Sequence, residues 1–228
     1  MILITLKKES LVISLIIADD HPLFRSALSS ALRAEMKGIS IEEAYDLDST
    51  LRCLRQMEEV DLLLLDLNMP GSGDLFGLIR IRTDFPDIPV AVISGSDDVD
   101  MVAKVIEAGA LGFIPKTSEP VIYSNAINAI LAGDIWLPEY LEAELQGQPK
   151  PDLSMQHRVA ELTPQQYKVL CYLHEGLLNK QIAYELSISE ATVKAHITAI
   201  FRKLEINNRT QAVLVASELK LQIGSQQA

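Results

Sequence analysis

Four short apolar runs in the first half of the chain each end at polar residues, and this repeated pattern constrains the fold more than any other feature. The polar residues that follow the runs are Asp19-Asp20, Asp66, Ser94 and Lys116. Short continuous apolar runs are typical of strands in a parallel sheet that is buried on both faces. Such sheets bind ligands beyond the carboxyl ends of their strands. We therefore expect these five side chains to meet at one edge of a sheet.

The segments between the apolar runs have the periodicity of helices. Together with a further strand near residues 39–44, they predict alternating strands and helices as far as residue 133. Five such units imply an α/β doubly wound parallel sheet of five strands with helices on both faces. The helices are expected over residues 22–35, 48–58, 74–83, 98–108 and 119–132.

The C-terminal region contains helical patterns only. Thr163, Pro164 and Gln166 predict a capped helix start, because Thr and Gln can form a capping box and proline fits the first helical position. Gly176 is expected to end this helix. Three more helices should follow, over residues 180–186, over about 190–204 with Ser189 as the cap, and from Thr210 to about 219.

A short helix, a tight turn and a longer helix make a helix-turn-helix. The apolar stripe of the longer helix consists of Val193, Ile197, Ile200 and Leu204. A helix buried on that side points Ala191, Ala195, Thr198 and Arg202 outward. Small outward side chains let a helix enter the major groove of DNA, and flanking cations such as Lys194 meet phosphates. The stripe alone supports a helical module that binds another protein equally well.

These patterns divide the chain into four parts. We expect an N-terminal extension over residues 1–10, an α/β domain over residues 11–136, a linker over residues 137–160 and an all-α four-helix domain over residues 161–228. Two prolines and a glycine within residues 147–152 discourage a continuous helix in the linker.

The net charge of −11 is unevenly distributed. Residues 1–136 carry 11 Lys and Arg against 21 Asp and Glu, a net charge of −10, whereas residues 161–228 carry 7 against 6, a net charge of +1. A nucleic-acid-binding domain at the C-terminus would therefore act with only a modest attractive field.

Hydropathy and cysteine content predict a cytoplasmic protein without a membrane partner. No apolar run reaches the roughly 18 residues that span a bilayer. The N-terminal run is cut short by Lys7-Lys8-Glu9, which is unlike a signal peptide. Cys53 and Cys171 lie in different halves of the chain, and two lone thiols suit a reducing compartment.

The side chains expected at the strand ends suit a divalent metal and a phosphoryl group. Clustered carboxylates repel one another, and a divalent cation offsets that repulsion. Mg²⁺ takes few protein carboxylates, several waters and phosphate oxygens. One carboxylate can attack phosphorus and give an acyl phosphate. Lys116 would neutralise phosphoryl oxygens, and the Ser94 hydroxyl would donate a hydrogen bond to one of them.

Four motifs in the first part of the chain resemble the receiver domain of two-component response regulators. They are Asp19-Asp20-His21-Pro22, Asp66-Leu67-Asn68-Met69-Pro70-Gly71, Ser94-Gly95 and Phe113-Ile114-Pro115-Lys116. The resemblance covers roughly residues 14–133 and implies the flavodoxin-like strand order 2-1-3-4-5.

The resemblance also implies a role for individual residues. Asp66 would accept a phosphoryl group from a sensor histidine kinase, with Lys116 and Ser94 as the catalytic partners. Ser94 and Phe113 would form the switch pair, whose hydroxyl and ring move when the phosphoryl group arrives.

Mg²⁺ is the cofactor that the resemblance implies. Asp20 and Asp66 would bind it directly, Asp19 mostly through water, and the backbone carbonyl of Asn68 would complete the protein ligands.

Two positions depart from the commonest receiver pattern. Many receivers place proline after the lysine, whereas here Pro115 precedes Lys116 and Thr117 follows it. The residues Gly71-Ser72-Gly73-Asp74 also differ from the usual continuation after the proline and glycine.

The stretch 161–219 resembles the LuxR-type DNA-binding domain. The resemblance is carried by Leu162-Thr163-Pro164, by Gly176 to Ala183, by Ser189 to His196, by Arg202-Lys203-Leu204 and by Asn208 to Ala212. It implies base-edge contacts from Lys194, Ala195 and Thr198, and phosphate contacts from Lys180, Thr192, Lys203, Arg209 and Thr210. Its fourth helix would supply the contact of a homodimer. Thr198 stands where some relatives carry a basic residue, which predicts a lower affinity or a different site.

Together the two resemblances indicate a response regulator of the NarL/FixJ subfamily. Phosphorylation of Asp66 would control dimerisation and transcription through the helix-turn-helix on double-stranded DNA. The protein would not be an enzyme apart from its own phosphorylation and dephosphorylation at Asp66. Three alternatives are a phosphorylation-independent regulator with the same DNA-binding domain, a phosphotransferase and a ligand sensor. Two forms of control stay open, in which the unphosphorylated receiver covers the recognition helix or only fails to dimerise.

Overall fold

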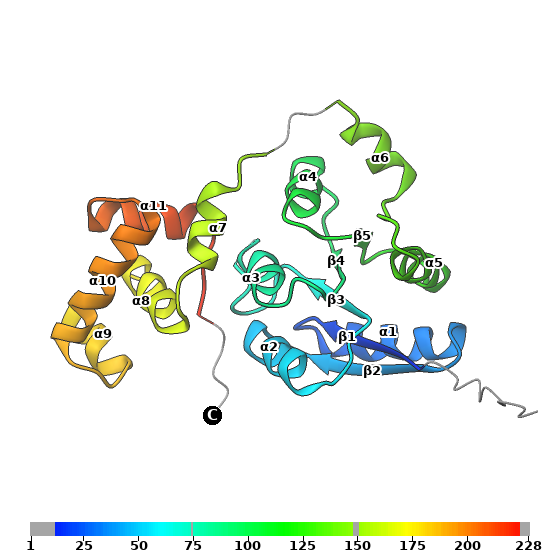
Figure 1. Cartoon of the computed structure of the whole chain (residues 1–228), viewed down its shortest axis with the longest axis horizontal. Helices are drawn as coiled ribbons and strands as arrows, with labels where there is room; N and C mark the ends of the chain where they lie inside the picture. The colour runs from blue at the N-terminus through cyan, green and yellow to red at the C-terminus, as the bar shows by residue number, and fades with distance from the viewer. Residues whose placement is uncertain (1–11, 74, 148–150, 224–228) are drawn as a thin grey trace, which may run out of the picture.

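The computed structural model describes residues 12–73, 75–147 and 151–223. The extension expected over residues 1–10 lies outside these residues. Figure 1 shows an α/β domain that contains the sheet and a C-terminal domain of helices beside it.

The α/β domain contains one parallel sheet of five strands in the order β2-β1-β3-β4-β5, which confirms the expected topology. All four apolar runs form strands because their side chains are buried on both faces of the sheet. The strand order reverses between β1 and β3, and such a reversal opens a crevice at the carboxyl ends of the strands. The strands are β1 (Ile13–Ala18), β2 (Ile39–Ala44), β3 (Leu62–Asp66), β4 (Val90–Ser94) and β5 (Gly112–Pro115).

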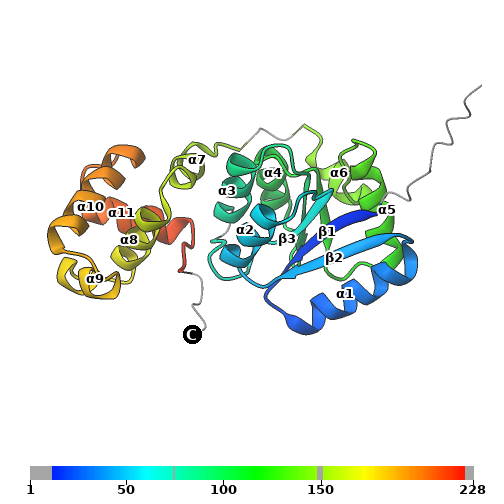
Figure 2. The ribbon, with the colours of Figure 1, turned by 60° about the horizontal axis from the view of Figure 1, so that its bottom comes forward.

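Five helices cover the two faces of the sheet. Leu15, Ile17 and Leu64 pack with buried residues of α1 (Pro22–Glu35) and α5 (Pro120–Leu131). The alternate residues of β1 and β3 point to the other face, where the remaining three helices pack. These are α2 (Leu47–Gln56), α3 (Phe76–Asp84) and α4 (Val99–Glu107), and Figure 2 shows α1 on the side of the sheet away from α2 and α3.

The ends of these helices depend on local caps. Helix α1 has its expected bounds, with Pro22 at its first position. Helix α2 starts one residue earlier than expected because the Asp46 carboxylate accepts a hydrogen bond from the Ser49 amide, and the Ser49 side chain bonds the Asp46 amide in return. Helix α3 begins at Phe76, two residues later than its expected start.

The C-terminal domain has the four expected helices, α8 (Pro164–His174), α9 (Asn179–Glu185), α10 (Glu190–Leu204) and α11 (Arg209–Glu218). The capping box of Thr163 and Gln166 and the Ser189 cap are confirmed. The prediction that Thr210 opens the fourth helix is one residue late, because the Asn208 side chain accepts the Gln211 amide and caps α11.

Two short helices lie in the region expected to be a linker. Helix α6 (Glu139–Leu145) contacts α4. Helix α7 (Ser154–Ala160), which was not among the helices expected, contacts both α3 and α10 and so lies between the two domains in Figure 1. Within the described residues, no helix has the length and apolar character needed to cross a membrane.

Candidate functional site

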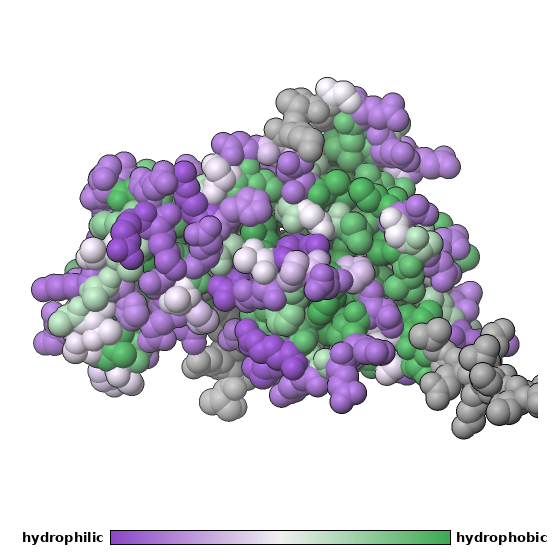
Figure 3. All heavy atoms as spheres, viewed as in Figure 1, coloured by the Kyte–Doolittle hydropathy of each residue, from purple (hydrophilic) through white to green (hydrophobic). Residues whose placement is uncertain are grey.

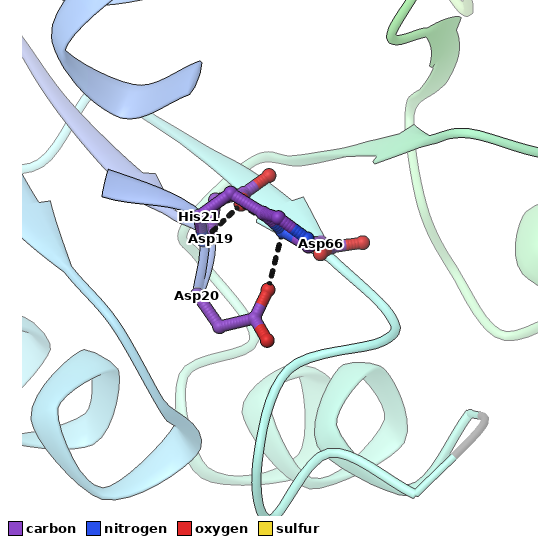
Figure 4. A group of neighbouring side chains, drawn as sticks. All are labelled: Asp19, Asp20, His21 and Asp66. Atoms are coloured by element: carbon purple, nitrogen blue, oxygen red, sulfur yellow. Dashed lines mark hydrogen bonds and ion pairs between the residues drawn. The ribbon is translucent and has the colours of Figure 1, made fainter. Parts of the chain in front are cut away.

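An acidic cluster lies at the carboxyl ends of β1 and β3, as the sequence predicted. One ligand atom each from Asp19, Asp20, His21 and Asp66 lies within 4.8 Å of the others. Asp19 and Asp66 are fully buried, whereas the side chain of Asp20 is 32% exposed. Figure 4 shows the four side chains converging at the end of these neighbouring strands. The cluster forms because a parallel sheet brings the ends of β1 and β3 to the same edge.

Lys116 is the cation of this cluster. Its Nζ atom lies 2.6 Å from Oδ2 of Asp19 and 2.8 Å from Oδ2 of Asp66. The ammonium group also lies 5.2 Å from the centroid of the Phe24 ring, close enough for a cation–π interaction. The Lys116 amide donates a 2.7 Å hydrogen bond to the Ser94 carbonyl, which fixes the residue after β5 against the end of β4.

Burial and the ion pair act in opposite directions on the pKa values of Asp66 and Lys116. Burial raises the pKa of Asp66 above its ordinary value, although the hydrogen bond from Lys116 opposes this rise. Burial disfavours the charge on Lys116, but its hydrogen bonds to Asp19 and Asp66 outweigh burial and raise its pKa. Lys116 therefore stays charged, whereas burial makes the ionised form of Asp66 costly in free energy.

The donor set fits a divalent cation. The three carboxylates of Asp19, Asp20 and Asp66 face the single ammonium group of Lys116, so negative charge is in excess at the cluster. Hard carboxylate oxygens are the ligands that Mg²⁺ and similar cations prefer. The residues present are compatible with a metal site of this kind.

His21 and Arg25 join the cluster from the start of α1. His21 was not among the site residues expected from the sequence, but its Nδ1 atom lies 2.7 Å from Oδ1 of Asp20 and 3.2 Å from Oδ1 of Asp19. Arg25 donates a hydrogen bond to the Asp19 carbonyl and pairs with Glu43 at 3.2 Å. The spacing was the available signal, since His21 caps α1 and Arg25 follows four residues later on the same side.

The other expected site residues occupy different positions around this edge. The Asn68 amide donates a 3.2 Å hydrogen bond to Asp66 Oδ1. Ser94 ends β4 and is buried, and its hydroxyl accepts a 3.2 Å hydrogen bond from the Ser96 amide. Phe113 lies in the apolar core on β5 and is fully buried.

Most of the expected DNA-contacting residues lie on the surface of the C-terminal domain. Lys203 and Arg209 are half-buried, and each donates to a backbone carbonyl, Lys203 to Glu161 at 2.8 Å and Arg209 to Leu177 at 2.6 Å. Figure 3 shows mainly hydrophilic side chains over this domain and more apolar side chains over the α/β domain. The exposed members of the expected set are Lys180, Thr192, Lys194, Ala195, Thr198, Arg202 and Thr210.

Two family models match the chain, one in each domain. Residues 15–128 match the response regulator receiver domain, and residues 160–216 match the LuxR family of bacterial regulatory proteins. The chain is 42% identical over 210 residues to the glycerol metabolism activator of Pseudomonas putida, with 90% of this chain and 95% of that protein covered. It is 34% identical over 212 residues to the nitrate/nitrite response regulator protein NarP of Escherichia coli, with 91% and 95% covered.

A solved structure of the response regulator RcsB from Salmonella typhimurium has the same fold. It aligns with a TM-score of 0.54 and 23% identity, and the alignment covers 90% of this chain and 98% of that chain. At this level of identity the similarity concerns the fold alone.

Asp66→Asn should increase the free energy of unfolding at about pH 7 in buffer without divalent cations, because it removes a buried negative charge while Lys116 keeps its ion pair with Asp19. The raised pKa of Asp66 means that its ionisation opposes folding once the pH exceeds the ordinary carboxyl value of 3.8. The gain in stability should therefore shrink towards about pH 4. Urea unfolding followed by circular dichroism measures the free energy of unfolding of the wild type and the variant at each of these two pH values. The control Asp134→Asn replaces an exposed carboxylate and should leave the free energy of unfolding unchanged at both pH values. An Asp66→Asn variant that is less stable than the wild type at about pH 7 would contradict this electrostatic account.

Proposed function

The chain belongs to the NarL/FixJ-type response regulators, in which a receiver domain is joined to a LuxR-type DNA-binding domain, and from this premise we propose that phosphorylation of Asp66 controls dimerisation and DNA binding. It is a DNA-binding response regulator and does not belong to an enzyme family. We propose residues 11–136 as the receiver, 137–160 as the linker and 161–228 as the DNA-binding domain, after an extension over residues 1–10.

The observation that carries this proposal is the ion pair of Lys116 with both Asp19 and Asp66 in a buried cluster. An Asp66 oxygen attacks phosphorus as the phosphorus–nitrogen bond of a phosphohistidine on a sensor histidine kinase breaks, and the imidazole leaves with a proton. Lys116 then contacts the phosphoryl oxygens, since its ammonium group is already 2.8 Å from the Asp66 carboxylate that attacks. The later hydrolysis of the acyl phosphate at Asp66 returns the protein to its starting state.

The metal that we propose for the cluster is Mg²⁺. Asp20, Asp66 and the backbone carbonyl of Asn68 would hold it directly, and Asp19 mostly through water. When bound, Mg²⁺ supplies positive charge that offsets the carboxylates and the phosphoryl oxygens. The excess of carboxylates over ammonium groups at the cluster supports this assignment.

Ser94 and Phe113 are the proposed switch residues. Ser94 ends the strand next to β3, so its hydroxyl can hydrogen-bond a phosphoryl oxygen on Asp66. Phe113 is fully buried on the neighbouring strand β5, where the register pairs it with Val92. A shift of the Ser94 hydroxyl towards the phosphoryl group would therefore change the packing around this ring.

The partners that we propose are a sensor histidine kinase, double-stranded DNA and a second copy of the chain, in the cytoplasm. The surface of α10 supports DNA binding because Lys194, Ala195 and Thr198 are exposed and small or cationic. This surface is extended towards the phosphates by four more exposed side chains, those of Lys180, Thr192, Arg202 and Thr210. Lys203 and Arg209 contact phosphates only after leaving the carbonyls that they now bond.

Acetyl phosphate and Mg²⁺ should add about 80 Da to the full chain, the mass of one phosphoryl group. Intact-mass spectrometry should find this gain in the wild type and in Asp134→Ala, whose carboxylate is exposed and distant in sequence from the cluster. Asp66→Ala should show no gain, because it removes the accepting oxygen. An equal gain in Asp66→Ala would contradict the proposed acceptor, and a failure of the wild type to react would favour the phosphorylation-independent alternative.

Lys180→Gln should weaken binding to mixed-sequence double-stranded DNA. The slope of the logarithm of the affinity against the logarithm of the salt concentration should become shallower by about one unit, as expected when one phosphate contact is lost. Fluorescence anisotropy over a series of salt concentrations measures this slope. The control is Lys37→Gln, which removes an exposed lysine of the α/β domain and should leave the slope unchanged. Equal slopes for Lys180→Gln and the wild type would remove Lys180 from the DNA-binding surface.

A further inference from the structure

Of the four clustered side chains of Asp19, Asp20, His21 and Asp66, the imidazole of His21 has no role in the proposed function. Its Nδ1 atom lies 2.7 Å from Oδ1 of Asp20 and 3.2 Å from Oδ1 of Asp19, and Figure 4 shows both contacts as dashed lines. An imidazole nitrogen and a carboxylate oxygen prefer different metals. The position of this ring therefore bears on which ions the cluster takes.

The backbone around His21 fixes the position of the ring. Pro22 disfavours a helical conformation at the residue before it, and His21 accordingly has extended φ and ψ angles of −89° and 104°. The His21 amide donates a 2.8 Å hydrogen bond to Asp19 Oδ1, and the His21 carbonyl accepts the Arg25 amide at 3.1 Å. The His21 side chain makes no capping hydrogen bond to α1, so the helix start does not depend on the ring.

Arg25 holds the start of α1 against the sheet. Its guanidinium group donates to the Asp19 carbonyl and pairs with Glu43 of β2 at 3.2 Å. The Glu43 carboxylate also accepts the hydroxyl of Ser29 on α1 at 3.0 Å. These bonds join the end of β1, the strand β2 and α1 independently of the imidazole. They therefore orient His21 towards the carboxylates before any ion binds.

The contact between His21 and Asp20 is close but does not have the geometry of a hydrogen bond. Within the described part of the chain, Oδ1 of Asp20 is a buried atom without a hydrogen-bond partner, although Nδ1 of His21 lies 2.7 Å away. A buried polar atom without a partner costs free energy, and a bound cation would remove that cost. A cation on this oxygen would also lie within reach of the imidazole nitrogen.

The spacing of the four ligand atoms suits one small ion. These atoms lie within 4.8 Å of one another. Ligands bound at about 2.1 Å lie about 4.2 Å apart on opposite sides of a metal and about 3 Å apart in neighbouring positions. The 2.7 and 3.2 Å contacts of the His21 Nδ1 atom match neighbouring positions. The His21 side chain is 67% exposed, so its Nε2 atom can carry the ring proton towards water.

The two kinds of donor distinguish between metals. Mg²⁺ keeps oxygen ligands and several waters, so an imidazole adds little to its binding. Imidazole suits first-row transition ions, and the affinity of sites with nitrogen and oxygen donors rises from Mn²⁺ to Ni²⁺. We propose that His21 is a direct ligand of divalent transition ions at this cluster and makes the receiver bind them more tightly than Mg²⁺. The inference rests on the metal site of the proposed function.

His21→Ala should weaken the binding of Ni²⁺ to the untagged full chain by about 10-fold or more, no less than the loss of a group behind a metal ligand. The affinity for Mg²⁺ should stay within about 2-fold, because its oxygen ligands remain. Isothermal titration calorimetry measures both affinities. The matched control is His174→Ala, which removes an exposed histidine of α8 and should bind both ions like the wild type.

Pulsed electron paramagnetic resonance of bound Mn²⁺ reports the metal–nitrogen bond itself. Hyperfine coupling to an imidazole nitrogen should appear in the wild type and in His174→Ala and be absent from His21→Ala. Native circular dichroism identifies a variant that has simply unfolded, in which case His21→Asn decides, since asparagine is a favourable helix cap.

The results separate the role of His21 from the metal site as a whole. Absence of the nitrogen coupling in the wild type, or an unchanged Ni²⁺ affinity in a folded His21 variant, would overturn the ligand role of His21 alone. A wild type that binds neither Mg²⁺ nor Ni²⁺ would overturn the metal site of the proposed function and the role of His21 with it.

Discussion

The placement of one ammonium group between two fully buried carboxylates holds the site at the strand ends together. Lys116 bonds Asp19 and Asp66, which come from different strands, and its amide bonds the carbonyl of Ser94 on a third. Two buried carboxylates would otherwise repel each other. The lysine makes their burial tolerable, yet one ammonium group leaves the cluster with excess negative charge, which suits a divalent cation and a transient phosphoryl group.

The same stretch of chain connects this chemistry to the DNA-binding domain. Asp66 ends β3, and the loop after it contacts Tyr167 and Leu221 of the C-terminal domain before α3 begins. Helix α3 then carries Phe76 and Arg80, which bind the start of that domain. Because the contacts with the second domain lie within 14 residues of the acidic cluster in sequence, a change at Asp66 does not need to cross the sheet to reach them.

Much of the fold could be predicted from the sequence because its signals are local or follow from topology. Buried strands are continuous apolar runs, and parallel pairing alone brings the ends of β1 and β3 together, so Asp19, Asp20 and Asp66 could be placed. Helix ends were less certain, since caps compete over one or two positions, as with Asn208 and Thr210. The roles of these site residues in phosphoryl transfer and DNA contact remain predictions.

Tertiary contacts between the domains could not be predicted. Helix α7 is only seven residues long and is stabilised by packing against α3 and α10, which leaves little periodic signal. The sequence marked residues 71–73 as unusual, but the reason lies in Leu221, nearly 150 residues later.

The most direct test of the account is the affinity of the full chain for DNA sites selected from a random pool, measured with and without acetyl phosphate and Mg²⁺. Phosphorylation should tighten binding by about 5- to 150-fold in the wild type and leave Asp66→Ala unchanged, whereas equal affinities in the two states of the wild type would contradict it.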